Sequence, residues 1–134
     1  IRAEGAKALA PTIRDSTSMT SINLRANALG PEGAKALAPA ICDSPSVTSI
    51  DVGYNRIDQA ASLELLAAMK GKHMVSIGMA DCDLGVEGSK VVAEMISVMA
   101  SLTRVDVRDN DLGTHSKDVL RKAVEGRSGL KLLL

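Results

Sequence analysis

The chain has 134 residues, of which 46% are apolar, and it carries 16 basic and 16 acidic side chains. This length suits one domain, and the balanced charge argues against a nucleic-acid-binding or acidic-lipid-binding surface, which needs clustered lysine and arginine. No apolar run reaches the roughly 18 residues that a membrane span requires.

The two cysteines, Cys42 and Cys82, follow no metal-ligand spacing and build no disulfide framework. The chain opens on charged residues and lacks the apolar run of a signal peptide. We therefore expect a cytoplasmic, intracellular protein that holds no metal and no other cofactor, and that binds neither nucleic acid nor membrane.

The sequence repeats itself with a period close to 28 residues. Residues 4–11 and 32–39 both read EGAKALAP. A pattern of apolar-x-x-apolar-x-apolar-x-x-Asn/Cys-x-apolar starts at Met19, Val47, Met74 and Leu102, and Leu130 with Leu133 begins a fifth copy. Self-similarity at a fixed period of this length is typical of a solenoid.

Each repeat alternates between a helix and a strand along the chain. Helices are predicted where apolar residues fall four apart, at Leu9 and Ile13, Leu37 and Ile41, Leu65 and Met69, Val92 and Ile96, and Leu120 and Val124. Strands are predicted where apolar residues alternate, at 22–24, 50–52, 77–79 and 105–107. The first two helices should kink or break near Pro11 and Pro39, because a mid-helix proline removes a hydrogen bond and crowds the preceding turn.

Strands stack about 4.8 Å apart, whereas helices need about 8–10 Å between their axes, so the stack should bend with its strands inside. The segments LGPEGAKAL at 29–37 and LGVEG at 84–88, within four copies of the pattern, resemble the leucine-rich-repeat family and its ribonuclease-inhibitor-like class. The resemblance implies an α/β fold. It is a right-handed solenoid shaped as a horseshoe arc, with parallel strands on the concave face and helices on the convex face.

We predict a single solenoid over residues 1–134 that belongs to a longer protein. It has a repeat fragment at 1–18, repeats starting near 19, 47, 74 and 102, and a partial repeat at 130–134. In this register Leu132 and Leu134 face outward from the last strand. An exposed apolar edge strand invites pairing, so self-association through the C-terminal strand is a possible interaction.

A column of polar residues is predicted at the turn that follows each strand. Its members are Asn27, Asn55, Cys82 and Asn110. An asparagine amide carries both donors and acceptors, so it can satisfy the backbone groups that are buried where the chain leaves the strand.

Strand residues between the buried positions point to the concave face and carry most of the variation between repeats. The resemblance implies a protein partner on this face, and the residues predicted to bind it are Tyr54, Arg25, Asn23, Asp51, Asp81, Arg104, Asp106 and Arg108. Tyrosine and arginine are enriched among binding hot spots, but Tyr54 fits equally well as a solvated strand residue that packs on its neighbours. For the arginines and aspartates, ion pairs between strands are the favoured alternative.

No phosphate-binding glycine loop, nucleophile elbow or catalytic Ser/His/Asp set is present. The triplets at 81–83 and 109–111 lack the spacing of a calcium loop. We therefore predict a protein–protein interaction module, not an enzyme, that binds through its concave strand face. Two alternatives stay open: a GTPase-activating regulator like the Ran activator, and a structural or self-assembling spacer.

Overall fold

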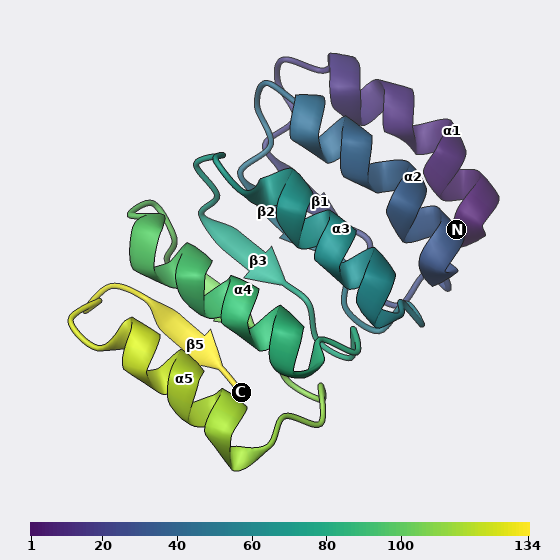
Figure 1. The fold of residues 1–134 in the computed structure, drawn as a ribbon. Helices are drawn as coiled ribbons and strands as arrows, with labels where there is room; N and C mark the ends of the chain where they lie inside the picture. The colour runs from purple at the N-terminus through teal and green to yellow at the C-terminus, as the bar shows by residue number, and fades with distance from the viewer.

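The computed structural model describes residues 1–134 as five α-helices and five short β-strands that alternate along the chain (Figure 1). The helices are α1 (Arg2–Asp15), α2 (Gly30–Asp43), α3 (Gln59–Met69), α4 (Gly85–Val98) and α5 (Thr114–Val124). The strands are β1 (Ser21–Asn23), β2 (Ser49–Asp51), β3 (Ser76–Gly78), β4 (Arg104–Asp106) and β5 (Lys131–Leu133). None of the five helices combines the length and the apolar character needed to span a membrane.

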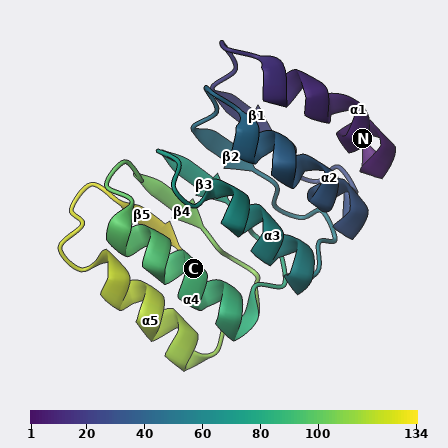
Figure 2. The same cartoon turned by 45° about the horizontal axis from the view of Figure 1, so that its top comes forward.

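The five strands form one parallel sheet, in the order in which they occur along the chain. The register aligns Ser21 with Ser49, Ser49 with Ser76 and Ser76 with Arg104, as the repeat alignment predicts. The helices form a second row along one side of the sheet, with α1 and β5 at opposite ends of the stack (Figures 1 and 2). The predicted fold class, a right-handed α/β solenoid with strands on its concave face and helices on its convex face, is confirmed.

The core fills the space between the row of strands and the row of helices. The central residues of the first four strands, Ile22, Ile50, Ile77 and Val105, are at most 7% exposed, and the helix residue Leu65 is fully buried. Burying these side chains against the next repeat supplies the main favourable term for the stack. Because each layer is thin, aliphatic and methionine side chains fill it without any aromatic ring.

Buried asparagines join neighbouring repeats at the turn after each strand. The Nδ2 of Asn110 donates to three backbone oxygens at 2.9 to 3.1 Å, one of which belongs to Met79 in the preceding repeat. Its Oδ1 accepts the N–H groups of Cys82 and Leu84 at 2.9 and 3.1 Å. Asn55 makes the same five hydrogen bonds one step earlier. Each of these two amides therefore ties the backbones of two repeats together.

Cys82 occupies the same position in the third repeat but bonds differently. Its buried thiol lies 3.4 Å from the Ala80 oxygen, and burial raises the pKa of the thiol to about 12. A protonated thiol is a poor acceptor. In the preceding repeat, the N–H groups of Asn27 and Leu29 donate to the side-chain oxygen of Asn55. The corresponding N–H groups of Asn55 and Ile57 make no hydrogen bond. The turn between the second and third repeats is therefore bonded less completely than those on either side.

The last strand lies one residue away from its predicted register. Leu132 pairs with Val105, so Leu132 holds an inward position. The prediction that Leu132 and Leu134 face outward is wrong, because both pack against the core. The step from Arg104 to its partner Lys131 is 27 residues, whereas the step from Ser76 to Arg104 is 28, and a shift of one residue exchanges the two faces of a strand. Self-association through this strand stays a prediction.

Helices α1 and α2 run without interruption through Pro11 and Pro39, so the predicted breaks do not occur. Both prolines lie on the exposed side of their helix. The carbonyl groups that lose their donor belong to the exposed residues Lys7 and Lys35, and water can hydrogen-bond to them there. The solvent-facing position limits the cost of each proline.

The asparagine bridges predict a strong, position-dependent effect on stability. The Asn110→Ala variant should lower the free energy of unfolding by about 3 kcal/mol, because it leaves buried N–H and C=O groups of two repeats without partners. The matched Asn27→Ala variant should cost about 1 kcal/mol or less, since Asn27 is half-buried and its Nδ2 donates to one backbone oxygen only. Urea unfolding followed by circular dichroism measures both, and equal losses would contradict the bridging role of Asn110.

Candidate functional site

The concave face is built from strand side chains that point away from the core, together with the first turn residues. One aligned column contains Asn23, Asp51, Gly78 and Asp106, and the next contains Arg25, Gly53, Ala80 and Arg108. The turn residues Ala26, Tyr54, Asp81 and Asp109 all have φ between 49° and 58°, the left-handed conformation that turns the chain out of the strand. This turn places the Tyr54 ring at the edge of the concave face.

Arg25 and Tyr54 lie together across several repeats. The Arg25 guanidinium carbon is 4.5 Å from the centre of the Tyr54 ring, which is a cation–π geometry. The Tyr54 hydroxyl donates a hydrogen bond to Asp109, and this bond raises the pKa of the hydroxyl. The Arg25 Nη1 is also 3.4 Å from an Asp51 carboxylate oxygen and 3.7 Å from one of Asp106. These contacts link the first, second and fourth repeats.

Asp106 is the buried centre of this network. Its side chain is fully buried, and Arg108 binds both of its carboxylate oxygens at 2.9 and 2.8 Å. Arg104 lies 4.0 Å away on the same strand. Burial opposes ionisation of the carboxyl, but the hydrogen bonds from Arg108 outweigh it and hold the pKa of Asp106 below its usual range. Asp106 is therefore a carboxylate at neutral pH, with arginine side chains around it.

Comparison with known proteins agrees with this architecture. A family model described as Leucine Rich repeat matches residues 15–38. The fold of the chain is that of a leucine-rich-repeat solenoid. Among solved structures, the C-terminal domain of tropomodulin from Caenorhabditis elegans is similar, with a TM-score of 0.74 over 98% of this chain and 80% of that chain. Sequence identity to it is 14%, so the likeness concerns the fold alone. No curated protein matches the chain in sequence.

The predicted binding residues divide into two groups in this leucine-rich-repeat fold. The structure brings six of them into one network, and these are Arg25, Asp51, Tyr54, Arg104, Asp106 and Arg108. It leaves two outside it: Asn23 accepts the backbone N–H of Arg25 at 3.1 Å, and Asp81 is exposed without an ion pair. Ion pairs between strands, the alternative that the sequence favours for these charges, are therefore present.

One further network residue and two glycines beside the network lie outside the predicted binding set. Asp109 accepts the Tyr54 hydroxyl, and its position in the same turn column as Tyr54 is the sequence signal for it. Gly53 and Gly78 lie against the side chain of Asp51. Their sequence signal is the absence of a side chain in columns whose other members include charged residues.

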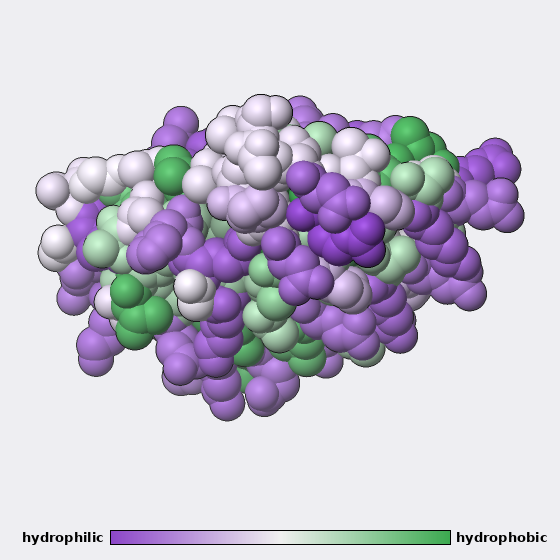
Figure 3. Space-filling view, turned by 90° about the horizontal axis from the view of Figure 1, so that it is seen from above, coloured by the Kyte–Doolittle hydropathy of each residue, from purple (hydrophilic) through white to green (hydrophobic).

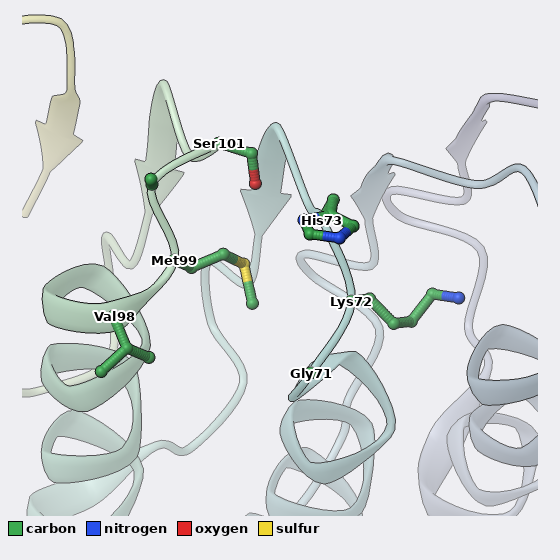
Figure 4. A pocket seen from close by; sticks show the side chains of 7 residues that line it. Gly71, Lys72, His73, Val98, Met99 and Ser101 are labelled. Carbon is green, nitrogen blue, oxygen red and sulfur yellow. The ribbon is translucent and has the colours of Figure 1, made fainter.

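A separate shallow pocket of about 270 Å³ lies between the loops that follow α3 and α4 (Figure 4). His73, Val98, Met99 and Ser101 border it, while the Lys72 side chain points away and its Nζ donates to the Ser44 oxygen at 2.7 Å. No group of three or more His, Cys, Asp or Glu side chains with metal-binding geometry occurs in the chain. The concave network, in which six charged or polar side chains contact one another, is the candidate site that we consider further.

The lowered pKa of Asp106 predicts a specific dependence of stability on pH. Because the folded pKa lies below the unfolded value of about 4, the ionised carboxylate stabilises the fold above that pH, and this contribution is lost as pH falls through the folded pKa. Asp106→Asn should lower the free energy of unfolding by about 1–3 kcal/mol at pH 7, and by less in acid.

The control for this prediction is Asp118→Asn, whose carboxylate pairs with Arg121 on the exposed surface of α5. Its cost should lie within about 1 kcal/mol of zero at every pH. Urea unfolding of both variants between pH 7 and pH 2 measures the difference. A cost of Asp106→Asn that does not change over this range would contradict the assignment.

Proposed function

We propose that the chain is a protein–protein interaction module that binds its partner through the concave strand face, centred on Tyr54 and Arg25. The observation that carries this proposal is the position of the only aromatic side chain, which lies half-buried on this face beneath an arginine. Tyrosine and arginine supply large, amphipathic contact area and dominate binding energies at interfaces. A curved surface of parallel strands also presents its side chains in fixed columns, which suits recognition of an extended surface.

Few large apolar side chains are exposed elsewhere on the surface, so no other face presents an extended apolar patch for a partner. The exposed large apolar residues are Ile1, Val75, Val86 and Val98. On the side shown in Figure 3, hydrophilic and near-neutral residues cover most of the surface, and apolar residues form small, separated patches. These observations support recognition by polar and charged groups. The GTPase-activating and spacer alternatives, and a cytoplasmic location, stay predictions.

Photo-crosslinking tests the binding face directly. A benzophenone amino acid placed at position 54 of the full-length protein should crosslink to one partner in cells, whereas the same group at Lys35 on α2 should not. Lys35 is a suitable control because it is exposed on the helical side of the solenoid.

The purified partner then allows a quantitative comparison. Tyr54→Ala and Asp81→Ala should weaken its binding at least about tenfold, the size of an ordinary hot-spot effect, whereas Lys35→Ala should change it less than about twofold. Titration calorimetry measures all three. Loss of binding in Lys35→Ala, with the two concave variants unaffected, would contradict the proposal.

A further inference from the structure

The Arg25 guanidinium contacts three side chains of the same chain, which together form a binding seat on the concave face. The seat is defined by the carboxylates of Asp51 and Asp106 and the ring of Tyr54, which contact the guanidinium at 3.4, 3.7 and 4.5 Å respectively. One third of the Arg25 side chain stays exposed. The seat therefore opens to solvent and is filled from within the same chain.

Two glycines make room for this seat. A Cβ on Gly78 would lie 2.6 Å from the Asp51 Cγ, and a Cβ on Gly53 would lie 3.2 Å from the Asp51 Oδ1. The Asp51 side chain thus lies over bare backbone, with its Oδ1 accepting the Gly53 N–H at 2.9 Å. Gly78 lies between Asp51 and Asp106 in the aligned strands. Because Gly78 has no side chain, Arg25 can reach Asp106 in the fourth repeat.

Arg25 is the arginine that this network can release most easily. Asp106 keeps its two-point contact with Arg108 whether or not Arg25 is present. Partly exposed ion pairs contribute little to stability, so an equivalent cation can replace Arg25 at small cost. The Asp51 carboxylate has no other cation among its ion pairs and would require such a replacement.

The charge around the seat favours a cationic occupant. The strand-and-turn segments 21–30, 49–58, 76–85 and 104–113 contain seven aspartates and four arginines, and the fifth strand adds Lys131, although the whole chain is neutral. The concave side is therefore net acidic, and the rest of the chain carries the compensating positive charge. Opposite charge guides partners to such a face and selects among them.

We propose that this seat is the recognition subsite of the concave face, and that it takes an arginine side chain from a basic segment of the protein partner while Arg25 swings out. The proposal rests on the proposed function. A guanidinium fits because it can lie over the Tyr54 ring while its separate N–H groups reach two carboxylates. A lysine ammonium is a compact point charge that cannot bridge the seat in this way.

Emptying the seat allows a direct test with a small probe. The Arg25→Ala variant should bind N-acetylarginine amide in a saturable manner, and the fluorescence of Tyr54, the only aromatic residue, reports on this site alone. The wild-type chain should bind the probe about tenfold more weakly, because its own arginine fills the seat for most of the time. N-acetyllysine amide should bind Arg25→Ala less tightly than the arginine probe does.

Two further variants make the test specific. Arg56→Ala removes an exposed arginine of the neighbouring turn, so it matches the charge change without emptying the seat. It should respond like the wild type. Adding Asp51→Asn to Arg25→Ala should abolish probe binding. If Arg25→Ala does not fold, Arg25→Gln shortens the side chain, keeps its polar character and serves the same test.

The results separate this proposal from the proposed function. Absence of saturable binding by the folded Arg25 variant, or equal binding by Arg56→Ala, overturns the arginine seat even if Tyr54→Ala still releases the partner. Saturable, arginine-selective binding supports the seat. If every concave-face variant still binds the partner, the proposed function is wrong, and so is the assignment of the seat to an arginine of the partner. The binding of the probe by the emptied seat would remain valid as a separate result.

Discussion

The structure depends on the constraint that backbone groups buried at each strand-to-helix turn must find hydrogen-bond partners. Asn55 and Asn110 meet it by bonding to backbone atoms of two successive repeats at once. These bonds fix the offset between neighbouring turns, and the offset fixes which strand residues stand side by side. The columns of the concave face, and therefore the contacts of Arg25 and Tyr54, follow from that alignment.

The concave network adds coupling of a kind that solenoids ordinarily lack. In repeat proteins each unit contacts mainly its immediate neighbours, so stability is close to a sum of local terms. Here Arg25 in the first repeat reaches Asp106 in the fourth, and Tyr54 in the second reaches Asp109 in the fourth. The contact of Arg25 with Asp106 is possible because Gly78, which lies between Asp51 and Asp106 in the register, has no side chain. A partner that displaces Arg25 would therefore act on several repeats together.

Sequence periodicity was sufficient for the fold and for the columns. The identical blocks at 4–11 and 32–39 set the register, and the alternation at Ile22, Ile50, Ile77 and Val105 set the buried face. The pattern misplaces the fifth strand because Leu130 and Leu133 fit it as well as their neighbours do, whereas the structure pairs β4 with β5 at a step of 27 residues. Contacts between repeats that are not adjacent, such as Arg25 with Asp106, could not be predicted. The repeat alignment shows which residues are neighbours on adjacent strands, but it does not show how far a long side chain extends across the sheet.

Native-state hydrogen exchange of the turn amides tests the central constraint most directly. The Cys82 and Leu84 amides, which donate to the Asn110 Oδ1, should exchange slowly. The Asn55 and Ile57 amides, which make no hydrogen bond to the repeat that carries Cys82 in place of an asparagine, should exchange faster although both residues are similarly buried. Equal protection of the two pairs would contradict the account, since it would show that the asparagine side chains do not hold the repeats together.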